Sequence, residues 1–104
     1  MTNTKSLFHK IASGLADAEE GKMFGALCIK LKGKGKAFCM YWEESMIFKL
    51  KGESHKEALD MKGSRLFDPM GGRPMKEWVQ VSQEQSGHWE KFTKEAMNYV
   101  ESIN

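Results

Sequence analysis

The sequence predicts an α+β domain, in which helices cover one face of an antiparallel sheet of about five strands. Three observations lead to this prediction. Apolar residues at helical spacing occupy both ends of the chain, apolar and polar residues alternate through much of residues 24–51, and glycine-rich turns separate the alternating segments. The 104 residues can bury one core, so we expect a single domain over residues 1–104.

The first expected element is a helix over about residues 3–19, closed by Gly21. Its apolar stripe needs a sheet or a second helix as cover. The stripe consists of Leu7, Phe8, Ile11, Ala12 and Leu15.

Three antiparallel strands are expected after this helix. The first alternates over residues 27–32, and the turn Gly33–Gly35 leads into the second. The second, residues 37–42, is apolar on both faces, as central strands are. A turn at residues 43–45 precedes the third strand, which alternates over residues 46–51.

The second half begins with a short helix, for which Ser54 and Glu57 form a capping box and Gly63 provides the C-terminal stop. Strands follow at residues 65–67 and 75–81. The order is therefore α-β-β-β-α-β-β-α, and the N- and C-terminal helices should cover one sheet face. The last helix begins between Ser82 and Gly87, and its expected buried face holds Trp89, Phe92, Ala96, Tyr99, Val100 and Ile103.

Two short motifs accompany this order: Met23-Phe24-Gly25, and the run from Phe67 to Val79 with its Gly-Gly-Arg-Pro turn. With the Gly-Lys hairpin at residues 33–36, they resemble the TfoX N-terminal domain family over about residues 21–100. The family takes its name from bacterial competence regulators, which carry a further C-terminal domain, and stand-alone members are similar to this chain in length. The resemblance implies an α+β fold and no known catalytic residue.

Composition and charge exclude several classes of protein. The formal net charge of +2 does not by itself demand nucleic acid, although residues 22–51 hold seven lysines and two acids. The first residues lack the apolar run of a signal peptide, and no stretch approaches the ~20 apolar residues of a membrane span. We therefore expect a cytoplasmic protein without a membrane segment.

No catalytic or metal constellation stands out in the sequence. His9, His55 and His88 fall in three expected helices without the spacing of a helical zinc site, and the two cysteines form no C-x-x-C. The glycine-lysine hairpin lacks the P-loop pattern. We expect no enzymatic activity, no metal and no cofactor.

Cys28 and Cys39 form a candidate redox pair. If Gly33 and Lys34 alone form the hairpin loop, the two cysteines lie directly opposite each other and can form a strained cross-strand disulfide. A three-residue loop would instead place them on opposite faces, and two buried thiols are the simpler interpretation.

A lysine-rich strand face is a candidate nucleic-acid site. In the expected sheet the lysines flank an aromatic ring, so they could hold a phosphate backbone while the ring stacks on a base. The alternative is a solvated sheet face on which the lysines protect the strand edges against aggregation. The candidate residues are Lys30, Lys32, Tyr41, Lys49 and Lys51.

The Gly-Gly-Arg-Pro turn presents Arg73 on a stiff loop, with Lys76 just beyond Pro74. These two cations are candidates for contacting a partner's carboxylate or phosphate. Arg73 could equally pair with Asp68 or Glu77 of its own domain.

We therefore expect a small regulatory or binding module. Its partner is unknown, and a protein partner is favoured over a nucleic acid. Nucleic-acid binding through the lysine face and thiol redox chemistry at Cys28 and Cys39 are the alternatives. The chain is expected to be a monomer or a homodimer.

Overall fold

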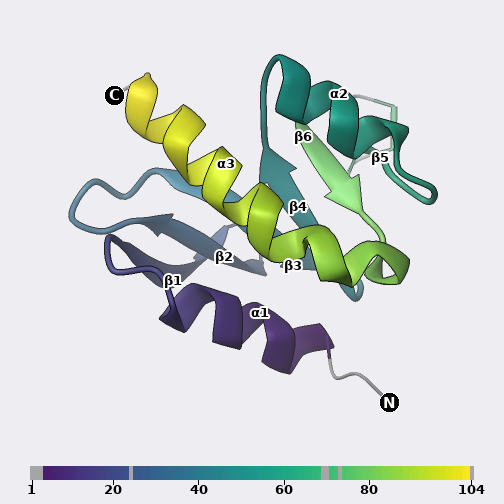
Figure 1. The fold of residues 1–104 in the computed structure, drawn as a ribbon. Coiled ribbons are helices and arrows are strands. Elements are labelled where there is room, and N and C mark those ends of the chain that lie inside the picture. Colours follow the sequence, from purple (N-terminus) through teal and green to yellow (C-terminus); the bar gives the residue numbers. More distant parts are fainter. Residues whose placement is uncertain (1–3, 24, 69–70, 73, 104) are drawn as a thin grey trace.

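The computed structural model describes residues 4–23, 25–68, 71–72 and 74–103, and it has the predicted α+β architecture. Six antiparallel strands form one sheet in the order β1-β2-β3-β4-β6-β5, with helices α1 and α3 on one face (Figure 1). The elements are α1 Thr4–Ser13, β1 Ala18–Met23, β2 Ala26–Leu31, β3 Ala37–Trp42, β4 Ser45–Lys49, α2 Glu53–Asp60, β5 Arg65–Phe67, β6 Met75–Val81, the 3-10 helix η1 Gln83–His88, and α3 Trp89–Ser102.

The sixth strand, β1, is the element that the sequence did not predict. The expected first helix ends at Ser13, and residues Ala18–Met23 form an edge strand against β2. Its residues, AEEGKM, show no apolar alternation because an edge strand pairs on one side only and benefits from charged side chains. Glu20 faces α1, where its Oε1 lies 2.7 Å from His9 Nδ1.

The main core lies between the sheet and the helices α1 and α3. Phe8 of α1 and the α3 residues Trp89 and Phe92 are fully buried there. The rings of Phe48 and Phe92 join strand β4 to α3, with centroids 5.8 Å apart. Apolar residues from the alternating runs of the first and third expected strands also belong to this core, among them Ile29, Leu31, Met46 and Phe48.

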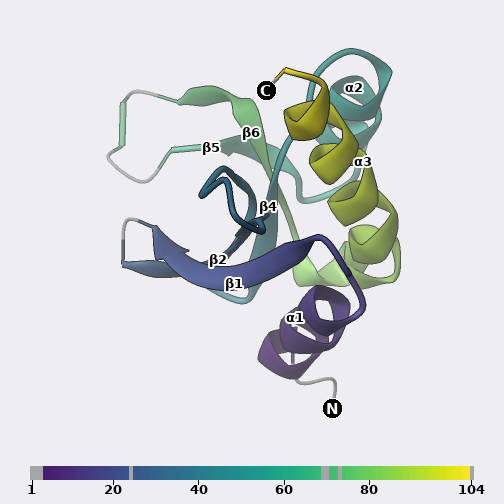
Figure 2. The same ribbon diagram turned by 90° about the vertical axis from the view of Figure 1, so that its left-hand side faces the viewer.

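A second apolar cluster lies on the opposite face, which no described helix covers. Figure 2 shows how the sheet curls, so that the β1–β2 and β5–β6 ends project on the side away from α3. Trp42 packs against Phe67 across this curve, edge to face, with ring centroids 6.0 Å apart. The buried members of this back cluster are Cys28, Met40, Ile47, Phe67 and Trp78.

The register between β2 and β3 differs from the predicted one. Ile29 pairs with Cys39 and Lys30 pairs with Ala37, so Phe38 is an extra residue in β3, as in a β-bulge. Both Phe38 and Cys39 consequently belong to the main core. The hairpin loop is also longer than two residues, because Leu31 N–H donates to the carbonyl of Lys36.

Two helix ends differ from prediction. The capping box is wrong, because α2 starts at Glu53 after Gly52, and Ser54 Oγ instead donates to Glu95 Oε2 at 3.0 Å. Ile103 is also not buried: α3 ends at Ser102, and 55% of Ile103 is exposed.

Candidate functional site

The five residues of the predicted lysine face do not share one face. Tyr41 lies on the helix side, where its ring packs 5.6 Å from that of Phe8 and its hydroxyl lies 2.6 Å from Thr4 Oγ1. Lys49 lies on the back face beside Trp78, with its Nζ 6.0 Å from the ring centroid. The bulge at Phe38 causes the separation, since it moves Tyr41 to the opposite face of β3.

The other three lysines of that prediction are also spread out. The Lys30 side chain crosses the adjacent strand so closely that a Cβ added to Gly21 would lie 2.5 Å from Lys30 Cε. Lys32 lies in the β2–β3 turn, and Lys51 lies beyond the end of β4, where both are exposed. The predicted aromatic platform flanked by lysines is therefore wrong.

The cross-strand pairing of the two cysteines is wrong for the same structural reason, and the simpler interpretation of two buried thiols is confirmed. Cys28 pairs with Met40 rather than with Cys39, so Cys28 belongs to the back cluster and Cys39 to the main core. Side chains on opposite sheet faces cannot form a disulfide without backbone movement. Burial raises the pKa of both thiols. For Cys39 the pKa lies well above the ordinary value of a cysteine, although a hydrogen bond with Thr93 offsets part of the rise.

The Gly-Gly-Arg-Pro turn can be followed only in part, because Arg73 lies outside the described residues. Asp68 stabilises the turn, since its two carboxylate oxygens accept the N–H groups of Gly71 and Gly72, each at 2.8 Å. Lys76 is exposed on β6, and its carbonyl oxygen accepts a hydrogen bond from His55 Nε2 at 2.7 Å. Its ammonium group remains a candidate for contacting a partner.

Glu77, the other acid considered for Arg73, has partners of its own. Its Oε2 accepts a hydrogen bond from the hydroxyl of Tyr99 on α3, and its Oε1 lies 4.0 Å from Lys49 Nζ. The hydrogen bond to Glu77 is the main cause that raises the pKa of Tyr99. Glu77 thus joins strands β4 and β6 to α3.

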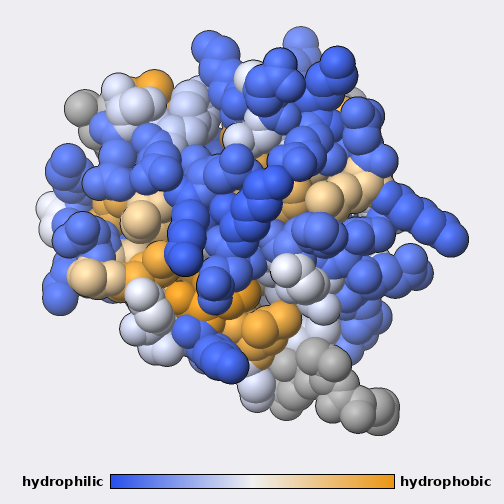
Figure 3. Space-filling view, viewed as in Figure 1, coloured by the Kyte–Doolittle hydropathy of each residue, from blue (hydrophilic) through white to orange (hydrophobic). Residues whose placement is uncertain are grey.

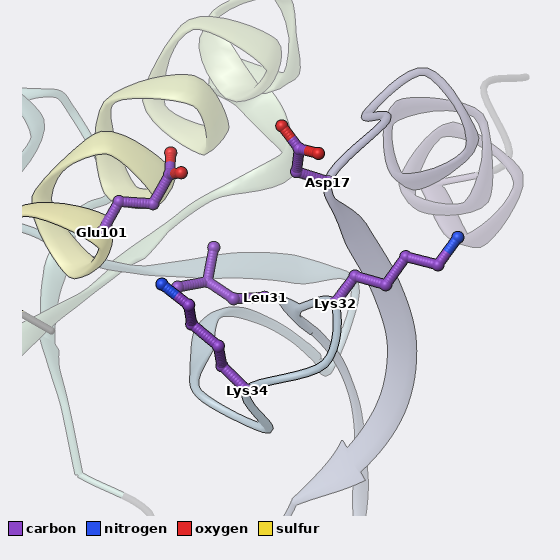
Figure 4. Close-up of a pocket in the computed structure, with 5 residues that line it drawn as sticks. All are labelled: Asp17, Leu31, Lys32, Lys34 and Glu101. Carbon is purple, nitrogen blue, oxygen red and sulfur yellow. The ribbon is translucent and has the colours of Figure 1, made fainter.

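One surface pocket combines charges of both signs over an apolar floor. It has a volume of about 300 Å³ and lies where the α1–β1 loop, the β2–β3 loop and the end of α3 meet. Figure 4 shows the carboxylates of Asp17 and Glu101 turned toward each other, with Lys34 below and Lys32 pointing away. The floor is Leu31, which is buried. Its two acids and two lysines give the lining no net charge.

A second pocket, of about 360 Å³, lies near the first residues of α1. Tyr41 and Trp42 contribute aromatic surface to it, while Lys5 and Glu43 supply opposite charges. The hydroxyl of Tyr41 is already occupied by Thr4. The pocket is therefore mainly an apolar hollow between two turns.

The third pocket is a groove between α1 and the segment that leads into α3, and it is the main candidate for a binding site. It has a volume of about 320 Å³, and Leu7 and Ile11 line its α1 side. Ser86, Gly87 and Glu90 line the other side. Figure 3 shows apolar surface exposed between the two helices, next to hydrophilic side chains.

The electrostatics of this α1–α3 groove are simple. Lys10 lies on the α1 wall and Glu90 on the α3 wall, and both side chains are exposed. Glu90 Oε1 lies 3.7 Å from Lys94 Nζ of its own helix. Exposed ion pairs of this kind contribute little to the stability of a protein. A Cβ added to Gly87 would meet no atom within 4 Å, so the backbone there leaves open space above the groove.

The described part of the chain contains no group of three or more His, Cys, Asp or Glu residues placed to hold a metal ion. None of its helices has the length and apolar character needed to cross a membrane. Comparison with family models, with curated proteins and with solved structures gave no significant match.

The amino-acid sequence contains only a partial signal for the groove. Leu7 and Ile11 were correctly predicted to belong to an apolar stripe, but a stripe does not reveal that Leu7 stays half-buried while Ile11 is covered. The open position above Gly87 depends on η1, whose turn precedes α3. Neither property can be read from spacing alone.

Proposed function

We propose that this chain is a small, non-enzymatic binding module of the TfoX N-terminal type that acts in the cytoplasm on a protein partner. The α1–α3 groove is the surface that carries this proposal. The half-buried Leu7 offers an apolar contact above the buried Ile11, and Lys10 and Glu90 flank it with opposite charges. An apolar centre with a charged rim is the usual composition of a protein-binding site.

The size of the groove favours side chains of a protein over a whole protein domain. About 320 Å³ is enough for one or two aliphatic side chains, inserted as anchors from a partner's helix or loop. The neighbouring α1 surface then provides the rest of the contact. Shape and apolar character limit the partner to a segment that presents such anchors.

The chemistry of the thiols supports a non-enzymatic role. A catalytic cysteine acts as a thiolate, which needs a lowered pKa and access to substrate. Burial raises the pKa of Cys28 and Cys39. Both side chains are buried, so neither thiol is prepared to attack a substrate.

Site-specific photo-crosslinking tests the proposal. A benzophenone amino acid at Lys10 lies on the groove, and the same residue at exposed Lys62, beyond α2, serves as the matched control. We expect Lys10 to crosslink to protein in the source cell, and the half-buried Leu7, changed to Glu, to abolish that product. Equal products from both positions, or a product insensitive to Leu7→Glu, would contradict the proposed function.

A second candidate function is contact with nucleic acid through the β2–β3 loop. Lys32, Lys34 and Lys36 are all exposed on this loop, alternating with Gly33 and Gly35. Such a loop can follow a phosphate backbone without reading bases. Titration with a generic oligonucleotide at several salt concentrations tests it: binding should weaken steeply with salt and be lost when the three lysines become glutamine.

A further inference from the structure

The two edges of the sheet differ in length. Strand β5 forms one edge with the three residues Arg65–Phe67, and β1 forms the other with the six residues Ala18–Met23. A very short edge strand offers little to a foreign strand, whereas a longer one presents a row of unpaired backbone groups. The β1 edge is therefore the one at which a strand of another chain could extend the sheet.

The backbone of β1 presents alternate residues to that edge. The carbonyl oxygen of Asp17 accepts the N–H of Lys32 on the inner side, at 2.8 Å. Because backbone groups in an antiparallel strand alternate in direction, the N–H and C=O groups of Ala18, Glu20 and Lys22 point outward. An added strand would form its hydrogen bonds with these three residues.

A lysine of the neighbouring strand lies over the middle of β1. Lys30 of β2 pairs with Glu19, and its side chain runs diagonally across Gly21. A Cβ built on Gly21 would lie 2.5 Å from Lys30 Cε and 3.0 Å from its Nζ. The lysine thus occupies the space that a side chain at position 21 would fill, and it brings an ammonium group onto the edge strand itself.

The other charges of β1 would allow two copies of the chain to pair. In an antiparallel pair centred on Gly21, the exposed Glu20 of each copy lies opposite the exposed Lys22 of the other, and opposite charges across two strands are favourable. The two Gly21 residues then face each other at the two-fold axis, with their Cβ positions about 4.5–5.5 Å apart. Since each carries the end of its own Lys30 side chain, this pairing brings two ammonium groups together.

We propose that Lys30 blocks pairing at the β1 edge, so that β1 of one copy does not pair with β1 of another and the sheet ends at β1. Like charges directly opposite one another destabilise paired strands, and an ammonium group loses water when a strand covers it. The block depends on two residues, because Gly21 leaves the space and Lys30 fills it with a charge. It is separate from the α1–α3 groove, to which neither residue contributes.

Removal of the charge tests the block. Lys30→Met keeps an unbranched side chain of similar length, and Lys32→Met, at an exposed position in the β2–β3 turn, removes the same charge elsewhere as the matched control. Sedimentation velocity over a wide range of concentrations measures self-association. We expect Lys30→Met to associate at least about 10-fold more tightly than the unchanged chain, and Lys32→Met to behave as the unchanged chain does.

A second variant removes the block from the glycine side. Gly21→Val places a side chain where Lys30 Cε lies, so it should push the flexible end of the lysine off the strand and also promote association. Circular dichroism checks that both variants are folded, and if one is not, the other decides. Amide hydrogen exchange locates the contact, because the outward N–H groups of Ala18, Glu20 and Lys22 should exchange more slowly in the associated variants.

Three results would overturn this inference. If the folded variants at positions 30 and 21 associate no more than the unchanged chain, Lys30 does not block the edge. If Lys30→Met and Lys32→Met associate equally, the total charge matters and the place of Lys30 on β1 does not. If the variants associate while the amides of β1 exchange as before, the contact lies on another surface.

Discussion

The two faces of the sheet bury similar side chains, but they do so by different means. On the helix face, α1 and α3 cover a large core that includes Phe48 and Phe92. On the back face, no described helix contributes, and the curl of the sheet itself buries Met40 and Ile47 completely (Figure 2). The back face shields its apolar side chains with strands alone.

The difference shows where a binding surface can arise. A sheet that curls on itself closes its apolar cluster and leaves little to a partner. Two separate helices laid over a sheet leave a groove wherever they diverge, as they do between Leu7 and Gly87. The helix face is therefore both the larger core and the face with an open apolar contact.

Truncation in the helix-covered core should have the largest effect. Phe92 is fully buried on α3, so Phe92→Ala should reduce the free energy of unfolding by ~3–5 kcal/mol, through lost burial and the cavity left behind. Urea denaturation followed by tryptophan fluorescence measures it. A loss near zero would mean that α3 does not pack on the sheet as described.

A truncation on the back face tests whether strands alone make a real core. Ile47 is fully buried there, and Ile47→Ala should cost ~2–5 kcal/mol, comparable to a core position under a helix. The same denaturation experiment applies, with Ile103→Ala as the control because Ile103 is 55% exposed. If both changes cost equally little, the back cluster is not packed.

The two cysteines report separately on the two faces. Burial raises the pKa of both thiols, and more strongly for Cys39 beneath α3. We expect alkylation of the native protein to be slow at both sites and slower at Cys39, and to become fast at both once the chain is unfolded. Mass spectrometry of pulse-labelled peptides gives the rates. A disulfide between them after mild oxidation of the native state would refute the assigned register.

Titration of Tyr99 tests the smaller polar link between α3 and the sheet. The hydrogen bond to Glu77 raises the pKa of Tyr99 in the folded state above its ordinary value of about 10. The protonated Tyr99 therefore contributes to the free energy of unfolding. This contribution is complete below pH 10 and is lost as the pH rises through the folded-state pKa. Absorbance near 295 nm should show a late-titrating tyrosine that disappears in Tyr99→Phe and shifts downward in Glu77→Gln.

The sequence predicted the elements whose pattern comes from burial. The alternating strands, the bounds of β5 and β6, and the buried face of α3 through Val100 all follow from apolar spacing. It could not predict β1, because an edge strand of charged residues shows no alternation. It also missed the bulge at Phe38, since one extra residue inside an all-apolar strand leaves no trace in the pattern.

That single bulge explains most of the errors in the candidate sites. Alternation is lost where β3 is apolar on both faces, so the faces of Cys39 and Tyr41 could not be assigned from the sequence. Features that depend on how separate elements meet, such as the groove between α1 and α3, need the tertiary structure.

The claim that the helix face is the interaction surface is tested most directly by amide hydrogen exchange. Exchange would be compared between the free chain and the same chain in its purified complex with the crosslinked partner. The account predicts slower exchange in Thr4–Ser13 and in residues 86–90, with β2 and β4 unchanged. Slower exchange confined to β1 or to the β2–β3 loop, with α1 unaffected, would contradict it.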